Sequence, residues 1–232
     1  MSTVNCIAAG HSLGEYSALA AAEVFSFEDG LKLVKARGEF IQKVSQQTEG
    51  TMAAIIGLDT SKVEEICKQA EDSNVCEPVN FNSPGQIVIA GSTERVKIVV
   101  DLAQKAGAMK AVLLNVSGPF HSSLMTPAAE MMKDELKKYS FSEPKFPVVT
   151  NCDGQVTTDA GAIKEKLVKQ INSPVYWESS MLKMTGAGTD VFIELGPQRI
   201  LSGLLRRIDK TKKSFNIEDK KTLEKTLEAL EK

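Results

Sequence analysis

The chain has 232 residues, of which 42% are hydrophobic and 25% are charged, a length and balance typical of a globular protein with one or two domains. Its formal net charge of −2 gives no reason to expect nucleic acid or an anionic membrane as a partner. No apolar run approaches the roughly 18 residues of a membrane span, and the start lacks the pattern of an export signal, so we expect a cytoplasmic protein.

The four cysteines indicate neither a metal site nor a disulfide framework. They form no Cys-x-x-Cys pair, and no histidine lies near them in the sequence. We therefore expect buried, reduced thiols and no metal or other cofactor. The four are Cys6, Cys67, Cys76 and Cys152.

The first predicted elements are a buried strand over residues 4–9 and a helix over residues 14–22, joined by the sequence GHSLG. Gly-x-Ser-x-Gly between a strand and a helix is the pattern of a nucleophile elbow, a tight turn that exposes a strained serine. We expect a side chain at either glycine, Gly10 or Gly14, to clash. A plain tight turn with an inert Ser12 is the alternative interpretation.

The next helix begins at Ser26, which we predict as its N-cap with Asp29 three residues later. The helix carries Arg37, for which a surface arginine paired with Glu39 or solvent is one interpretation. Its predicted apolar positions are Leu31, Val34, Phe40 and Ile41.

Residues 51–116 change to an alternation of short strands and helices. The order strand-helix-strand-strand-helix-strand predicts a small ferredoxin-like subdomain inserted in the chain. The predicted strands are residues 52–58, 76–81, 86–90 and 110–116, the helices are 60–70 and 93–106, and residues 82–85 form a turn.

The remainder of the chain alternates strands and helices again, which is typical of a parallel α/β sheet. We therefore assign residues 1–50 and 117–232 to one α/β core. The predicted helices are 127–139, 161–171, 198–207 and a charged terminal helix over 219–232, and the strands are 147–150 and 190–194.

A nucleophilic serine needs a general base, and the chain has only two histidines. His11 adjoins Ser12, and neighbours on such a turn point in different directions, so we expect it to shape the site. His121 lies in a loop where the subdomain rejoins the core, and we favour it as the base over a solvent-exposed histidine. The group that orients His121 stays open between Asp153, Asp190 and a carbonyl oxygen.

Four sequence motifs together resemble one family. They are GHSLGEYSAL at residues 10–19, PVNFNSPGQIVIAG at 78–91, GPFHSSLM at 118–125 and ELGP at 194–197. This part of the chain, residues 8–208, is similar to the malonyl-CoA:acyl carrier protein transacylases of type II fatty acid synthesis and to the acyltransferase domains of fatty acid and polyketide synthases.

The resemblance implies a hydrolase-like α/β fold with a ferredoxin-like insertion. It also implies transfer of malonyl from coenzyme A to the phosphopantetheine thiol of acyl carrier protein, so that malonyl-CoA and acyl carrier protein are the expected partners. The implied roles are Ser12 as the acylated nucleophile, His121 as base, Arg37 as the ligand of the malonyl carboxylate, Gln170 as the carbonyl that orients the histidine, Leu13 N–H as an oxyanion donor, and Phe120 as the residue that disfavours an α-methyl group.

The resemblance has one gap. Members of the family carry an upstream strand and a Gly-Gln-Gly-Ser-Gln motif that supplies a second oxyanion N–H, and nothing here matches it. We therefore expect the N-terminal part of the core to be missing, and these residues alone to be nearly inactive and poorly soluble. A serine thioesterase or esterase, and a non-catalytic fragment, are the alternative functions.

Overall fold

The computed structural model describes residues 6–69 and 74–231. The chain divides into two compact units, one up to Ser180 and one from Met181 onward. Parts of three predicted elements lie outside the described residues: residues 4–5 of the first strand, residue 70 of a helix and residue 232 of the terminal helix. No helix in the described ranges is both long and apolar enough to cross a membrane.

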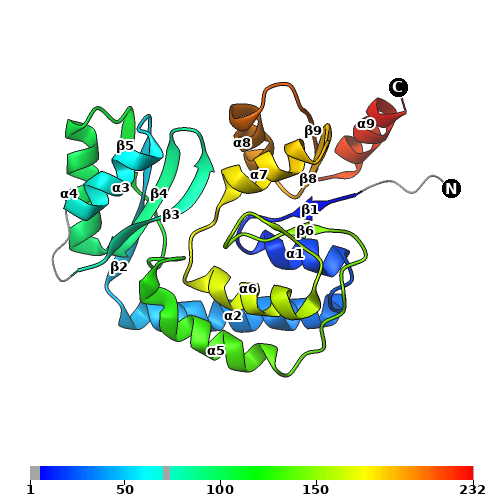
Figure 1. The fold of residues 1–232 in the computed structure, drawn as a ribbon, viewed down its shortest axis with the longest axis horizontal. Coiled ribbons are helices and arrows are strands. Elements are labelled where there is room, and N and C mark those ends of the chain that lie inside the picture. Colours follow the sequence, from blue (N-terminus) through cyan, green and yellow to red (C-terminus); the bar gives the residue numbers. More distant parts are fainter. Residues whose placement is uncertain (1–5, 70–73, 232) are drawn as a thin grey trace. The chain divides into compact units, whose positions relative to one another are not determined.

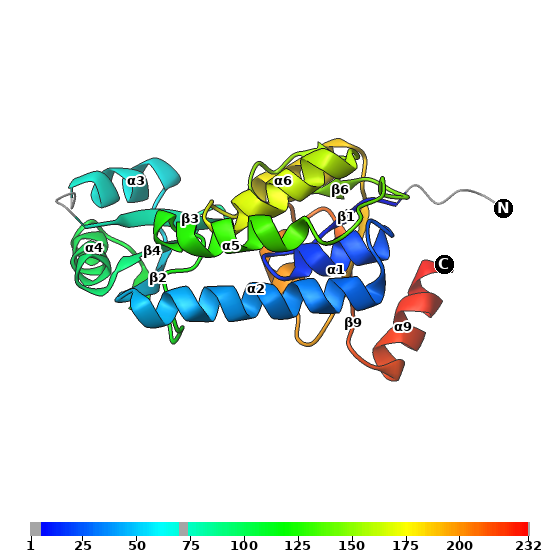
Figure 2. The ribbon, with the colours of Figure 1, turned by 90° about the horizontal axis from the view of Figure 1, so that it is seen from below.

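The core of the first unit is a three-stranded sheet covered by helices (Figure 1). Its central strand β6 (Val148–Val149) pairs in parallel with β1 (Ala8–Ala9) and antiparallel with β7 (Val156–Thr157). The long helix α2 runs beside α1 and α5 (Figure 2). The helical segments are α1 (Gly14–Ala21), α2 (Phe27–Gln47), η1 (Ser123–Met125), α5 (Thr126–Leu136) and α6 (Ala160–Ile171).

Helix α2 begins where the sequence predicts, and three of its four predicted apolar positions pack against the core: Val34, Phe40 and Ile41. The Ser26 side chain accepts a hydrogen bond from Asp29 N at 3.1 Å, as expected of an N-cap. Leu33 and Arg37, one turn apart, are buried, whereas Leu31 is 56% exposed. Two residues along a helix correspond to about 200° of rotation, so Leu31 points away from the face that holds Leu33, and its predicted core position is wrong.

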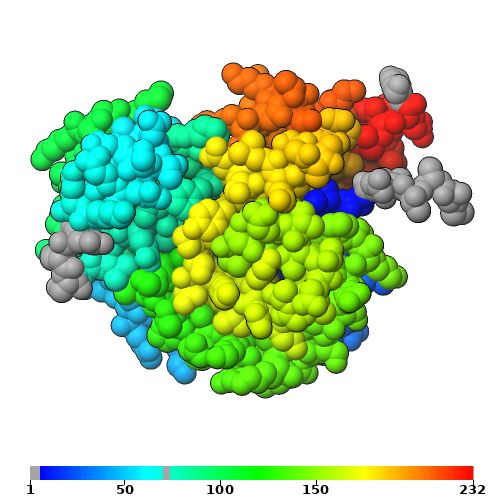
Figure 3. All heavy atoms as spheres, viewed as in Figure 1, coloured from blue at the N-terminus to red at the C-terminus, as the bar shows by residue number. Residues whose placement is uncertain are grey.

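The inserted segment folds as predicted, with the strand-helix order of a ferredoxin-like unit. Its sheet has the order β3-β4-β2-β5, with every neighbouring pair antiparallel. In the space-filling view the atoms of α3, coloured cyan, form part of the outer surface here (Figure 3). The elements are β2 (Gly50–Ile56), α3 (Thr60–Gln69), β3 (Cys76–Ser83), β4 (Gln86–Ser92), α4 (Thr93–Lys105) and β5 (Lys110–Leu113). The domain boundaries at residues 51 and 116 stay a prediction.

The edge strand β3 of this sheet is covered by a segment from far along the chain. Val175 N donates to Val79 O at 2.8 Å, and Phe81 N donates to Val175 O at 3.0 Å. The ring of Tyr176 stacks on Phe81, with centroids 5.1 Å apart. These contacts occupy backbone groups that an edge strand otherwise exposes.

The second unit contains a parallel strand pair. Strands β8 (Val191–Leu195) and β9 (Lys213–Ile217) pair in register, joined through α8 (Ile200–Ile208). The terminal helix α9 (Lys220–Leu230) begins with a capping box between Asp219 and Thr222. Neither β9 nor helix α7 (Trp177–Gly186), which begins in the first unit and ends in the second, was predicted from the sequence.

The cysteines are buried, as expected, at only two of their four positions. Cys67 and Cys76 are buried and Cys152 is half-buried, but Cys6 is exposed. All four are free thiols. Among the described residues no group of three His, Cys, Asp or Glu side chains is placed to hold a metal ion.

The turn between β1 and α1 has the strained geometry of a nucleophile elbow. Ser12 has φ 54°, a left-handed conformation that is rare for a residue with a side chain. A Cβ at Gly10 would overlap the Gly14 carbonyl, whereas a Cβ at Gly14 would meet none of the described atoms within 4 Å. The expected clash is therefore present at Gly10 and the prediction is wrong for Gly14, which is an ordinary first residue of α1.

Replacing the two glycines should have opposite effects on stability. In Gly10→Ala the added Cβ pushes against the Gly14 carbonyl and separates the two backbone segments of the turn. This should lower the free energy of unfolding by about 2–3 kcal/mol. The matched Gly14→Ala change should be neutral or stabilising by up to about 1 kcal/mol, since alanine favours helix. Urea unfolding of both variants measures this, and equal losses would contradict the asymmetry.

Candidate active site

Ser12 and His121 form a hydrogen-bonded pair at the elbow. Ser12 Oγ lies 2.8 Å from His121 Nε2, and His121 Nδ1 lies 2.7 Å from the backbone oxygen of Gln170. A carbonyl oxygen only accepts, so Nδ1 carries the proton and Nε2 has a free lone pair for the serine hydroxyl. This tautomer is the one that a general base requires. His121 is 6% exposed, so the solvent-exposed interpretation is wrong.

Burial keeps His121 neutral. Desolvation, followed by the nearby charge of Arg37, lowers the pKa of its imidazole to about 3, although the hydrogen bond to Gln170 opposes the shift. His121 also has a positive φ, 63°. The structure therefore holds an unprotonated imidazole against the serine at neutral pH.

Arg37 is buried at the same serine, not placed on the surface. Its Nη2 donates to Ser12 Oγ at 3.0 Å and to Gln170 Oε1 at 3.2 Å, and its guanidinium lies 5.8 Å from the centre of the Tyr16 ring. Among the described residues no carboxylate forms an ion pair with it. A buried cation without a counter-ion favours an anionic group brought by a ligand.

The side chain of Asn151, a residue not predicted from the sequence, forms hydrogen bonds with the backbone of the elbow. Its Oδ1 accepts from Ser12 N at 2.7 Å and its Nδ2 donates to Gly10 O at 2.8 Å. The available signal was its place directly after the predicted strand 147–150, where side chains at the carboxyl end of a core strand gather around a site.

Glu15 is a second residue that the sequence analysis missed. It is 0% exposed, and its Oε2 accepts from Asn151 N at 3.1 Å and from Gln170 Nε2 at 2.8 Å. Burial raises the pKa of its carboxyl to about 7, against these hydrogen bonds and the charge of Arg37.

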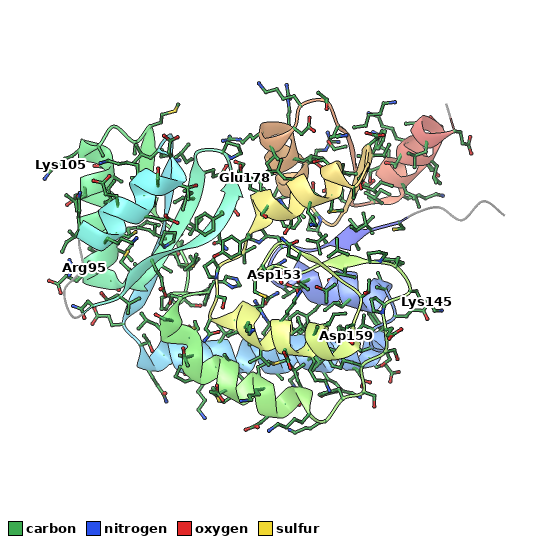
Figure 4. All side chains as sticks on the ribbon, viewed as in Figure 1. Arg95, Lys105, Lys145, Asp153, Asp159 and Glu178 are labelled. Carbon is green, nitrogen blue, oxygen red and sulfur yellow. The ribbon has the colours of Figure 1, made fainter. Side chains whose placement is uncertain are left out.

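The remaining candidates for the histidine partner lie elsewhere. Asp153, labelled in Figure 4, pairs with Lys166 at 2.8 Å, and Asp190 in the second unit pairs with Lys212 at 2.7 Å. His11 faces away from the pair: its Nε2 lies 2.8 Å from Asn82 Oδ1, and its ring lies 5.4 Å from that of Trp177.

A cavity of about 380 Å³ opens beside the pair. Phe120 is part of its wall, at the position where an aromatic ring narrows the space next to His121. Leu13 N, the expected oxyanion donor, follows Ser12 at the start of α1 and has no hydrogen-bond acceptor among the described residues. The cavity is lined by Ser12, Arg37, Gly38, Ile41, Gln42, Ser117, Phe120, His121, Met125 and Ile171.

A half-buried serine on an elbow, a neutral histidine against it and a cavity with a buried cation indicate a protein that transfers acyl groups through serine. Consistent with this, residues 4–225 match the family described as acyl transferase domain. The chain belongs to that acyltransferase family.

Within the family, the chain is similar to malonyl CoA-acyl carrier protein transacylases. It is 43% identical to the protein of that name from Bacillus subtilis over 223 residues, which cover 96% of this chain and 70% of that one. The relative from Escherichia coli K12 is 46% identical over 200 residues, 86% of this chain and 65% of that one. The chain thus spans about two thirds of the length of these curated relatives.

Solved structures agree in fold. An acyl carrier protein S-malonyltransferase from Vibrio cholerae superimposes with a TM-score of 0.92 at 41% identity, covering 95% of this chain and 72% of that one. A malonyl-transacylase in complex with its type II PKS acyl-carrier protein gives 0.93 at 42% identity, covering 95% and 72%. The hydrolase-like α/β core with a ferredoxin-like insertion is confirmed.

The imidazole of His121 should not titrate near its ordinary pKa of about 6.5. Because the folded protein lowers that pKa to about 3, its Cε1–H resonance should stay constant from pH 5 to pH 8 in an NMR titration. His11→Gln leaves a single imidazole signal for assignment, and the same protein in urea should titrate normally. A midpoint near 6.5 in the folded protein would contradict the buried, neutral dyad.

Proposed function

We propose that the chain transfers a malonyl group from coenzyme A to the phosphopantetheine thiol of acyl carrier protein, through a malonyl-Ser12 intermediate. The observation that carries the proposal is that Ser12 Oγ lies 2.8 Å from a neutral imidazole and 3.0 Å from a guanidinium that has no carboxylate partner among the described residues. The names of the similar proteins, and the similar enzyme solved with its carrier protein, support it.

Acylation starts at the serine–histidine contact. His121 Nε2 accepts the Ser12 proton as Oγ attacks the thioester carbonyl, and the Nδ1–H bond to Gln170 O stabilises the imidazolium that forms. Leu13 N–H donates to the oxyanion of the tetrahedral intermediate. When this intermediate collapses, the C–S bond breaks and the imidazolium returns its proton to the leaving thiolate.

Arg37 supplies selectivity for an acid at the far end of the acyl group. A guanidinium binds a carboxylate through two parallel hydrogen bonds, and a malonyl carboxylate would take up the donors that now face Ser12 Oγ and Gln170 Oε1. Phe120 narrows the space beside the α-carbon, which favours malonyl over methylmalonyl.

Transfer to the carrier protein repeats these steps in reverse. The phosphopantetheine thiol gives its proton to His121 and attacks the malonyl-serine ester, and Ser12 leaves with the proton returned by the imidazolium. The two substrates use the same serine in turn, which defines a ping-pong sequence.

The proposed division into two domains fits this chemistry. Residues 1–50 and 117–232 would form the catalytic core, and residues 51–116 a small subdomain. Ser12 and Arg37 then come from the first part of the core, and His121 and Gln170 from the second.

Ser12→Ala should abolish the malonyl-enzyme while leaving the fold intact, because it removes only the attacking oxygen. Intact-protein mass spectrometry after incubation with malonyl-CoA measures the adduct, which does not depend on turnover rate. A malonyl adduct that persists in the variant, or an unmodified wild-type chain, would contradict the proposal. Adding carrier protein should remove the adduct as malonyl-carrier protein, whereas release as free malonate without it would indicate a hydrolase.

Arg37→Ala should impair acylation by malonyl-CoA far more than by acetyl-CoA, because only malonyl carries the second carboxylate. Loss of a charge-assisted pair in a buried site costs about 2–4 kcal/mol of transition-state binding, about 30-fold to 1,000-fold in kcat/KM. Quenched acylation assays measure the rate with each thioester, and the rate with acetyl-CoA is the control for the rate with malonyl-CoA. Equal losses for both would mean that Arg37 serves the structure alone.

A further inference from the structure

One buried carboxylate connects the parts of the site that lie on different segments. Glu15 Oε2 receives hydrogen bonds from Gln170 Nε2 at 2.8 Å and from Asn151 N at 3.1 Å. Glu15 sits one turn after Ser12, whose carbonyl accepts from Glu15 N at 3.1 Å. It touches neither His121 nor Arg37 by a hydrogen bond.

The contact with Gln170 fixes the orientation of its side-chain amide. Gln170 Nε2 donates to Glu15 Oε2 and to Ser12 O, each at 2.8 Å, so that Oε1 is turned toward Arg37 Nη2 at 3.2 Å. The amide thereby separates a buried carboxyl from a buried guanidinium. Reversing the amide would place its oxygen against two acceptors and its NH₂ against a cation.

The same oxygen also fixes the backbone of Asn151. With its N–H held by Glu15, Asn151 presents Oδ1 to Ser12 N and Nδ2 to Gly10 O. Glu15 thus acts on the serine through Asn151, and on the histidine and the arginine through Gln170, whose carbonyl holds His121 Nδ1.

We propose that Glu15 is a positioning residue that holds Ser12, His121 and Arg37 in register by accepting the Gln170 and Asn151 hydrogen bonds on one oxygen. The inference rests on the proposed function only in taking Ser12 and His121 as the reacting pair. The proposal requires residue 15 to place a buried hydrogen-bond acceptor within reach of Gln170 Nε2 and Asn151 N. A glutamine retains such an oxygen, whereas an alanine or a methionine leaves the Gln170 amide and the Asn151 N–H without a partner.

The test measures the reactivity of Ser12 toward a fluorophosphonate. Ser12 Oγ forms a P–O bond as the P–F bond breaks and fluoride leaves, and the hydroxyl proton passes to His121 Nε2. This readout needs the dyad but no malonyl group. His121→Ala establishes that the rate reports on the base. Glu39→Gln is the matched control, since it removes a carboxylate two residues from Arg37 on the exposed face of α2. Within the described residues the ion pair of Glu39 is with Lys35, at 3.9 Å.

Glu15→Ala should slow phosphonylation by at least about tenfold, in line with the loss caused by small displacements of reacting groups, whereas Glu15→Gln should stay within about threefold of wild type. Glu15→Met, of similar size, replaces the alanine variant if circular dichroism shows that alanine unfolds the chain. Wild-type rates in a folded alanine or methionine variant would overturn the proposal. So would a folded glutamine variant as slow as alanine, because recovery by an acceptor is what separates positioning from packing.

The same samples separate the two proposals. Wild-type chain that reacts with the fluorophosphonate but forms no adduct with malonyl-CoA would end the malonyl assignment and leave the role of Glu15 to be decided by its own variants. A wild-type chain whose Ser12 reacts with neither reagent would overturn both.

Discussion

The left-handed backbone of Ser12 is the constraint on which the rest of the site depends. Ser12 has φ 54°, and the tight turn around it brings residue 10 against the Gly14 carbonyl. Residue 10 therefore has no room for a side chain, and only glycine fits there. The conformation is held from outside the turn, since Asn151 binds both Ser12 N and Gly10 O. Strain of this kind persists only where surrounding contacts determine the geometry. Here the side chain of Asn151 supplies those contacts.

The site also illustrates how a fold keeps several titratable groups out of water. Glu15, Tyr16, Arg37 and His121 are all buried within one region of the first unit. Burial acts on each according to its charge: it raises the pKa values of Glu15 and Tyr16 and lowers those of Arg37 and His121. The outcome is a neutral imidazole beside a cation for which the described part of the chain supplies no counter-ion, an arrangement that suits chemistry on an acyl group that ends in a carboxylate.

Much of this arrangement was predictable from the sequence, and the exceptions share a cause. The elbow, the N-cap of α2 and the order of the inserted sheet depend on residues close together in the chain, so local patterns indicate them. Glu15 reads as an ordinary acid in the first turn of a helix and Asn151 as a loop residue, because their roles arise from contacts across 136 and 141 positions. Arg37 and Gln170 were assigned by resemblance alone.

The long separations within the site have a consequence for the order in which the protein is made. Synthesis proceeds from the N-terminus, so the segment that carries Ser12 leaves the ribosome well before His121, 109 positions later, and Gln170, 158 positions later. Until that stretch has emerged, the serine has neither a base nor the amide that holds its backbone. Under the proposed mechanism, Ser12 of a nascent chain is therefore an unactivated alcohol, and it becomes reactive only when the α6 segment is complete and has docked.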